Sequence, residues 1–135
     1  MLIDTDVLIW YLRGNKSAKK IIEANIPFKI SVINYMELVL GVRNKRELRT
    51  LQEQLKNWSV EVIQINDTIS TRAMFFVEDY HLSHSLEYAD AVIAAAAIEK
   101  HEILITANDK HYNFIPNIRI SKFRLEEQAP GHYSP

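Results

Sequence analysis

The stretch Leu2-Ile3-Asp4-Thr5-Asp6-Val7-Leu8-Ile9 decides the fold, because a short apolar strand runs directly into acidic residues and then into an apolar segment. Val7–Leu12 predicts a helix that ends near Arg13-Gly14. A strand followed at once by a helix is the unit from which parallel sheets are built. The opening residues therefore predict a strand–helix unit with carboxylates at the junction.

This strand–helix alternation continues along the chain. We expect further strands at Phe28–Val32, Val60–Ile65, Ile103–Thr106 and Ile118–Ser121. We expect further helices at Ala18–Ala24, Ile33–Val42, Lys45–Trp58, Thr68–Tyr80 and Tyr88–Glu99. The alternation predicts an α/β fold, with a central parallel sheet covered by helices on both faces. Functional groups of such folds gather beyond the carboxyl ends of the strands.

Composition narrows the possible chemistry. The chain has 135 residues, enough for one domain, and its 47% hydrophobic and 24% charged residues are typical of globular proteins. The absence of cysteine excludes disulfide frameworks, thiolate zinc sites and cysteine nucleophiles. The three glycines lie too far apart for a glycine-rich phosphate loop. A net charge of −1 means that any nucleic-acid partner must be held by local basic patches or by metal.

The expected organisation is one domain over residues 1–123 and a loose C-terminal tail over 124–135. Asp4 and Asp6 stand where a signal peptide would have basic residues. The longest apolar run, Ala91–Ile98, is too short to span a membrane. We therefore expect a cytoplasmic protein that does not bind membranes.

Four acidic residues occupy strand-end or apolar settings: Asp4, Glu37, Asp90 and Asp109. Three of the segments leave strands at the same edge of the expected parallel sheet, and Asp90, near the start of its own helix, can face that edge, so these carboxylates can converge. Carboxylate oxygens are the ligands that Mg²⁺ and Mn²⁺ prefer, and a divalent ion relieves the repulsion between them. A metal bound there can polarise a phosphodiester and activate water, which predicts a phosphodiester hydrolase.

Each carboxylate also has a purely structural explanation. An aspartate at a strand end is often a turn or cap residue. Asp90, near the start of a helix, would interact favourably with the helix dipole. Glu37 is harder to explain in this way, because its apolar helix would make a fully buried, unpaired carboxylate costly. The expected convergence of all four favours the metal site.

At these residues the sequence resembles PIN-domain ribonucleases, especially the VapC-type toxins of bacterial and archaeal toxin–antitoxin pairs. Four segments carry the resemblance, in the family's order and spacing over about residues 1–123. They are Leu2-Ile-Asp-Thr-Asp-Val-Leu-Ile9, Ile30-Ser-Val-Ile-Asn-Tyr-Met-Glu-Leu-Val-Leu-Gly41, Tyr88-Ala-Asp-Ala-Val-Ile-Ala-Ala-Ala-Ala-Ile98 and Leu104-Ile-Thr-Ala-Asn-Asp-Lys-His-Tyr112. No single segment is very specific for this family, but the four segments together are.

The resemblance implies a three-layer α/β/α fold and a Mg²⁺- or Mn²⁺-dependent endoribonuclease. Asp4 and Asp90 would be the principal metal ligands, with Glu37 completing the site directly or through water. The fourth family position falls on either Asn108 or Asp109. Asp6 would be an additional ligand or the cap of the first helix.

The resemblance also implies supporting groups and partners. Thr5 and Thr106 would orient the ligands through their hydroxyl groups. Such toxins usually form homodimers, and a cognate VapB-type antitoxin covers the acidic site with one of its segments. Their typical substrate is structured RNA, often tRNA.

Basic residues offer candidate contacts to an RNA backbone. Arg43, Lys45, Arg46 and Arg49 follow the Glu37 helix, and Lys16, Lys19 and Lys20 form a second cluster. Phosphate contacts require such groups, although each is also typical of a solvated helix face. His81 and His84 have helical chelate spacing, but they lie where the expected helix is ending, before Ser85, so we do not expect a metal there.

Two other functions fit parts of the sequence. Asp4-Thr5-Asp6 also resembles the opening of haloacid-dehalogenase-type phosphatases, in which the first aspartate is the nucleophile. The chain is short for that class and has no adjacent downstream aspartate pair. The other alternative is a catalytically weak PIN-like module that only binds RNA or a partner, which the ambiguous fourth segment favours.

Overall fold

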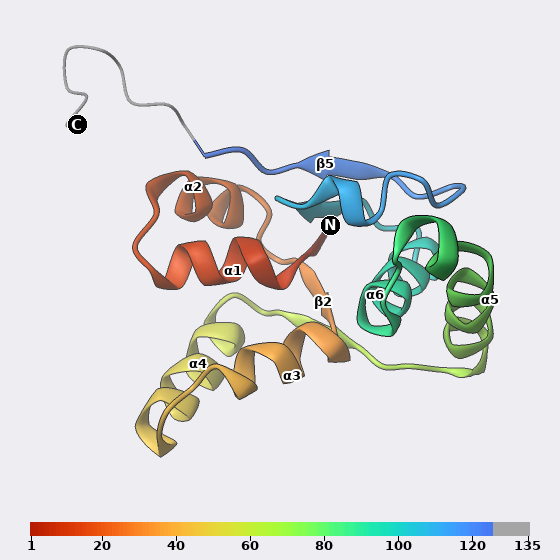
Figure 1. Ribbon diagram of the computed structural model, residues 1–135. Helices are drawn as coiled ribbons and strands as arrows, with labels where there is room; N and C mark the ends of the chain where they lie inside the picture. The colour runs from red at the N-terminus through yellow and green to blue at the C-terminus, as the bar shows by residue number, and fades with distance from the viewer. Residues whose placement is uncertain (126–135) are drawn as a thin grey trace, which may run out of the picture.

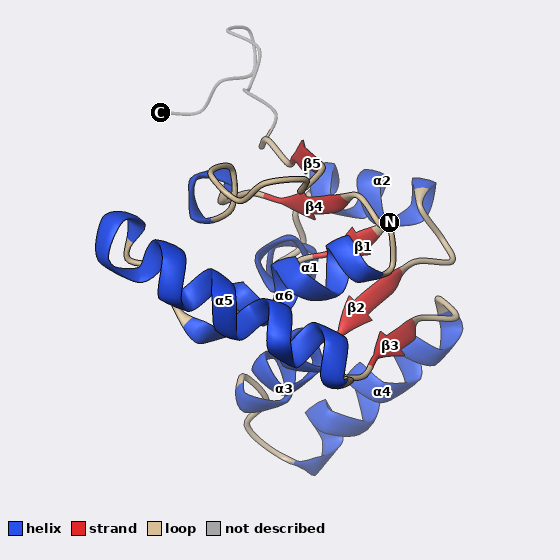
Figure 2. Ribbon diagram, turned by 90° about the vertical axis from the view of Figure 1, so that its right-hand side faces the viewer, coloured by secondary structure: helices blue, strands red, loops and turns tan. Residues whose placement is uncertain are grey.

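The computed structural model describes residues 1–125, and these form a three-layer α/β/α arrangement (Figure 1). Five short strands make the central layer: β1 (Leu2–Ile3), β2 (Lys29–Ser31), β3 (Glu61–Ile63), β4 (Leu104–Thr106) and β5 (Ile120–Lys122). All four pairings between them are parallel, and the strand order is β3-β2-β1-β4-β5 (Figure 2). The expectation of a parallel sheet is confirmed.

Six helices cover the sheet: α1 (Thr5–Leu12), α2 (Lys16–Ala24), α3 (Val32–Leu40), α4 (Lys45–Asn57), α5 (Asp67–His84) and α6 (Tyr88–Glu99). Helices α1 to α4 lie on one side and α5 and α6 on the other (Figure 1). A 3₁₀ turn at Asp109–His111 precedes the last strand.

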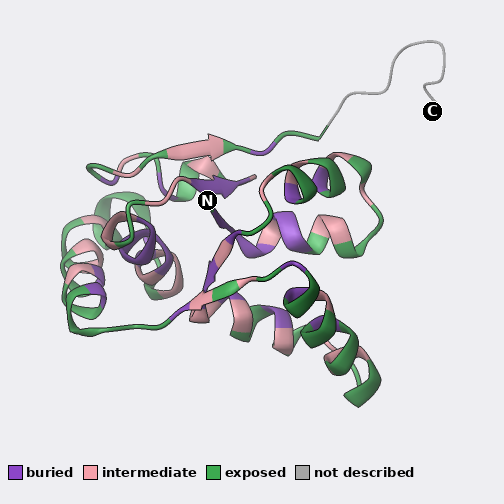
Figure 3. Cartoon of the chain, turned by 180° about the vertical axis from the view of Figure 1, so that it is seen from behind, coloured by how far each residue is buried: buried purple, intermediate pink, exposed green. Residues whose placement is uncertain are grey.

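The strands alternate between two hydrophobic cores, as a period of two requires. Leu2 and Leu104 pack with α5 and α6, whereas Ile3 and Ile105 pack with α1 to α4. Figure 3 shows the buried positions concentrated on the strands and on the helix faces beside them. Phe123 is buried in the second core, so the folded domain extends at least to this residue.

Several boundaries differ from the sequence expectation. Helix α5 continues through His84 and ends where Ser85 adopts a left-handed conformation, with its N–H donating to the His81 carbonyl. The last turn of α5 is exposed, so it carries no apolar periodicity that the sequence could reveal. The expected tail falls mostly on residues 126–135, which lie outside the described part. No helix among residues 1–125 is long and apolar enough to cross a membrane.

Candidate functional site

The strand order brings the candidate residues to one edge of the sheet. The central strand β1 pairs with β2 on one side and with β4 on the other, and all three run in the same direction. Asp4, Ser31 and Thr106 therefore stand side by side at the carboxyl ends of these strands. From β1 the chain continues to β2 and β3 on one side of it, and then returns to form β4 and β5 on the other side. Open α/β sheets place their sites where the strand order reverses in this way.

Asp4 lies at the centre of the site and is 7% exposed. Its Oδ1 accepts hydrogen bonds from the Thr5 backbone N–H at 2.9 Å and from Asn34 Nδ2 at 3.1 Å. Its Oδ2 accepts from Thr106 Oγ1 and from the Tyr112 hydroxyl, each at 2.9 Å. Asp4 also caps α1, so the same side chain begins a helix and anchors the site.

Asn34 explains why the second segment folds against Asp4. Ser31 caps α3, and its backbone N–H donates to Asn34 Oδ1 at 2.8 Å, which completes a capping box. This arrangement leaves Asn34 Nδ2 free to reach Asp4 and, at 2.9 Å, Thr5 Oγ1. The contacts of Asn34 with Asp4 and Thr5 have no local sequence signal, because their partners lie about thirty residues away.

Glu37 joins the site through Thr5, whose hydroxyl donates to Glu37 Oε1 at 2.6 Å. The Glu37 side chain is exposed, so the sequence argument about a buried carboxylate does not apply. Partial desolvation nevertheless raises the pKa of Glu37, and the charges of Asp4 and Asp90 raise it further, although the Thr5 hydrogen bond opposes them.

Asp90, in the first turn of α6, reaches the site from the opposite helical layer. Its Oδ1 lies 3.1 Å from the Tyr112 hydroxyl, and its Oδ2 lies 3.2 Å from His111 Nδ1. Burial raises the pKa of Asp90 most strongly, and the charge of Asp4 adds to this. The contacts with Tyr112 and His111 act in the opposite direction. The sequence analysis did not identify Tyr112, whose role depends on this meeting of layers.

Asp6 connects α1 with the segment after β4 through hydrogen bonds, and it is not the cap of α1. Its Oδ1 accepts from the Val7 N–H at 2.7 Å, while Oδ2 accepts from the Ala107 N–H at 3.0 Å and Asn108 Nδ2 at 2.9 Å. Burial and the negative charge of Asp4 raise the pKa of Asp6 to about 6, despite these hydrogen bonds. Asp6 therefore fixes the position of the fourth segment.

Asn108 and Asp109 take different positions. Asn108 is connected to the carboxylates through Asp6, and its backbone N–H donates to Thr106 Oγ1 at 3.1 Å. Asp109 lies in the 3₁₀ turn, and its Oδ1 forms an ion pair with Lys122 Nζ at 3.3 Å. Of the two candidates for the fourth position, Asn108 is thus the one with contacts inside the cluster.

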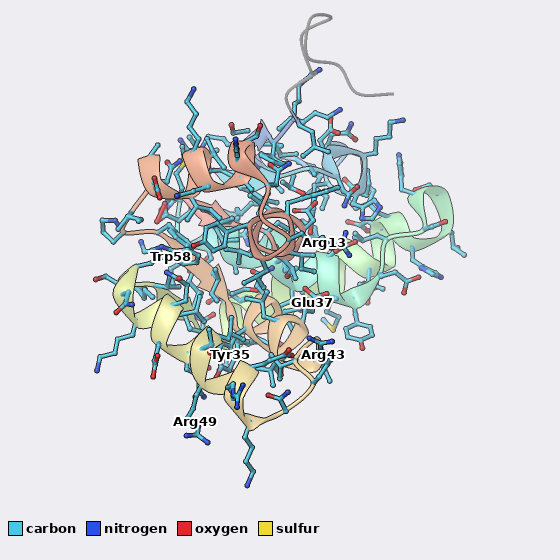
Figure 4. All side chains as sticks on the ribbon, turned by 90° about the vertical axis from the view of Figure 1, so that its left-hand side faces the viewer. Arg13, Tyr35, Glu37, Arg43, Arg49 and Trp58 are labelled. Atoms are coloured by element: carbon cyan, nitrogen blue, oxygen red, sulfur yellow. The ribbon has the colours of Figure 1, made fainter. Side chains whose placement is uncertain are left out.

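The basic residues after α3 do not form one continuous group. Arg43 pairs with Glu47, with 2.7 Å between the guanidinium and the carboxylate. In Figure 4 Glu37 is seen between Arg13 and Arg43, whereas Arg49 extends away from the body of the protein. Lys45 and Arg46 are exposed on α4. Arg43 is therefore already partly neutralised.

The histidine pair on α5 is engaged elsewhere. His81 Nδ1 lies 3.0 Å from the Leu86 carbonyl oxygen, and the His84 ring stacks on Phe114 with 4.1 Å between centroids. Both residues lie inside the helix, which corrects the expected boundary. The two imidazole rings thus have separate partners.

Comparison with known proteins gives a consistent assignment. The sequence model of the PIN-domain family matches residues 1–115. Ribonuclease VapC10 of Mycobacterium tuberculosis is 31% identical over 123 residues, which cover 88% of this chain and 90% of that protein.

Solved structures support the same family assignment. A toxin–antitoxin complex from Klebsiella pneumoniae contains a chain that is 30% identical, with a TM-score of 0.74 and coverage of 87% of this chain and 93% of that one. A DNA-bound VapBC from Salmonella typhimurium shares the fold with a TM-score of 0.78 at 20% identity, over 91% and 97% of the two chains. This protein belongs to the PIN-domain family, and within it to the VapC type.

Proposed function

We propose that this protein is a Mg²⁺- or Mn²⁺-dependent endoribonuclease and the toxin of a toxin–antitoxin pair. The observation that carries the proposal is that Asp4, Glu37 and Asp90, from three separate elements, are linked through shared hydrogen-bond partners. Asp4 shares the partner Thr5 with Glu37 and the partner Tyr112 with Asp90. The name of the ribonuclease relative and its 90% coverage support the same activity here.

The donor set fits a hard divalent cation. Asp4, Glu37 and Asp90 offer oxygen atoms only, which is the preference of Mg²⁺ and Mn²⁺. Burial raises the pKa of Glu37 and Asp90 most strongly, and repulsion from the charge of Asp4 raises both further. A bound cation would relieve that repulsion. We assign Asp4, Glu37 and Asp90 to its binding.

A metal bound by these carboxylates would supply Lewis acidity and an activated water molecule for phosphodiester hydrolysis. The chain itself supplies orientation. Asn34 and Thr106 hold the two oxygens of Asp4, and Thr5 holds Glu37. Asp109 lies at the rim with Lys122, where we propose a secondary contribution to the reaction.

The direct test is RNA cleavage during titration with Mg²⁺ or Mn²⁺, using a structured RNA such as tRNA. We expect divalent-dependent cleavage by the native chain and its loss in Asp4→Ala and Asp90→Asn. Asp79→Asn is the matched control, because Asp79 is an exposed acid on α5 outside the site. Equal cleavage by the two site variants and the control would contradict the nuclease proposal.

A catalytically weak RNA- or partner-binding module is the second candidate. Among residues 1–125, no three acidic or histidine side chains are grouped closely enough to hold an ion as they stand. RNA binding without metal-dependent cleavage in the same titration would support this candidate. The PIN-domain match removes the basis for the phosphatase alternative, because that alternative depended on Asp4-Thr5-Asp6 alone.

We further propose a VapB-type antitoxin as a partner, a cytoplasmic location and a homodimer. The toxin–antitoxin neighbour at 30% identity supports the antitoxin. Size-exclusion chromatography of the chain alone tests the dimer, and the same measurement after co-expression with a candidate antitoxin tests the partner.

A further inference from the structure

The Tyr112 hydroxyl lies between the two carboxylates that are assigned to the metal. It is 2.9 Å from Asp4 Oδ2 and 3.1 Å from Asp90 Oδ1. The tyrosine is 1% exposed and packs in the core beneath α5 and α6. Its backbone N–H donates to the Asp109 carbonyl at 3.0 Å, and its carbonyl accepts from the Ile115 N–H at 2.9 Å. The hydroxyl is therefore held in place by both ring packing and backbone.

The Tyr112 hydroxyl is limited in the hydrogen bonds that it can donate to the two carboxylates. A phenol carries one proton, so it cannot donate a full hydrogen bond to both carboxylates at once. The remaining acceptor positions of Asp4 are filled by Thr5, Asn34 and Thr106. The other oxygen of Asp90 faces His111 Nδ1 at 3.2 Å. The phenol thus occupies the space through which one cation would contact both aspartates.

We propose that Tyr112 is a positioning residue that holds Asp4 and Asp90 together through its hydroxyl and competes with the divalent cation for their oxygens. The proposal rests on the proposed metal-dependent function and adds a determinant of metal affinity to it. Binding of a cation between the aspartates then requires the hydroxyl to release at least one of them. Tyr112 sets the metal concentration at which the site fills.

Tyr112→Phe removes the hydroxyl and keeps the packed ring. In protein stripped with EDTA, we expect the melting temperature of this variant to fall, because Asp4 and Asp90 lose a shared donor. Calorimetric titration with Mn²⁺ should show roughly 3- to 10-fold tighter binding than in the native chain, the net scale of one ordinary hydrogen bond that no longer has to be broken. The rise in melting temperature on adding Mn²⁺ should be correspondingly larger.

Tyr35→Phe is the matched control, because the Tyr35 hydroxyl contacts Gln52 and not a carboxylate. It should leave Mn²⁺ affinity unchanged. A second measurement uses the native chain and needs no folded variant at this position. Mn²⁺ should produce an ultraviolet difference spectrum of tyrosine in the native chain and in Tyr35→Phe. Where Tyr112→Phe folds, it should lose this spectrum.

The outcomes separate this inference from the proposed function. Native binding of Mn²⁺ with equal or weaker binding by Tyr112→Phe overturns the competition and leaves the nuclease proposal standing. Native binding without the tyrosine difference spectrum also overturns it. Failure of the native chain to bind Mn²⁺ or Mg²⁺ overturns the metal site itself, and the competition with it.

Discussion

The side-chain amide of Asn34 donates a hydrogen bond to the Asp4 carboxylate, 3.1 Å away. Asn34 is completely buried where β1 and β2 end. The same amide group donates to Thr5 Oγ1, and Thr5 in turn donates to Glu37. One buried side chain thus orients two of the proposed metal ligands. Because buried polar groups are costly to leave without partners, this contact constrains both folding and activity.

Asn34→Ala should lower the free energy of unfolding by about 2 to 4 kcal/mol, since Asp4, Thr5 and Ser31 all lose a buried partner. Urea denaturation measures this loss. The control is Asn25→Ala, which removes only a bond to the Ile21 carbonyl. RNA cleavage by folded Asn34→Ala should fall about tenfold or more. Full cleavage by this variant would show that Asn34 has a structural role only.

Asp6 should make the metal-stripped protein less stable as the pH rises. Its pKa is about 6 in the folded protein against 3.8 ordinarily, so the folded state binds the proton more tightly. This contribution is fully present below about pH 4 and is lost as the pH rises through 6. The shift implies roughly 3 kcal/mol, and partial exposure reduces the expected effect to about 1 to 2 kcal/mol.

Urea denaturation in EDTA at several pH values tests this, with Asp6→Asn compared with the native chain. The difference in pH dependence between the two should appear between pH 4 and 6. Asp79→Asn should follow the native profile, because that side chain is exposed. Parallel profiles for Asp6→Asn and the native chain would contradict the assignment.

Asn108→Ala should reduce RNA cleavage more than Asp109→Asn does. The first change removes a hydrogen bond to Asp6, whereas the second removes a charge that is paired with Lys122 at 3.3 Å. We expect kcat/KM to fall by about tenfold for Asn108→Ala and by a few-fold at most for Asp109→Asn. The reverse order would place Asp109 at the reacting centre.

Replacing Arg43, Arg46 and Arg49 together with alanine should weaken RNA binding and reduce its salt dependence. Arg43 is already paired with Glu47, so we expect the loss of about two phosphate contacts and not three. The slope of log K against log salt should then change by about 1.4 to 1.8, at roughly 0.7 per contact on single strands and roughly 0.9 on a duplex. Lys19→Ala/Lys20→Ala on α2 is the comparison, and an unchanged slope in the arginine variant would reject this surface.

Much of the fold was accessible from sequence because its signals are local. Apolar strands such as Leu2–Ile3 end at polar residues, and the amphipathic α4 repeats every three or four positions. The end of α5 was missed because its exposed last turn has no apolar pattern. The order β3-β2-β1-β4-β5 has no local signal, because it depends on how separate units pack.

For the site, the sequence by itself determined which carboxylates leave the strands and that no thiolate or phosphate loop is available. Only the tertiary structure decided that Asn34 and Tyr112 meet Asp4 from opposite sides, that Asp109 pairs with Lys122, and that Arg43 pairs with Glu47. The physical reason is distance along the chain. Hydrogen bonds and ion pairs depend on positions to within a few tenths of an ångström, and for Asp4 packing brings together groups that lie 30 and 108 residues apart.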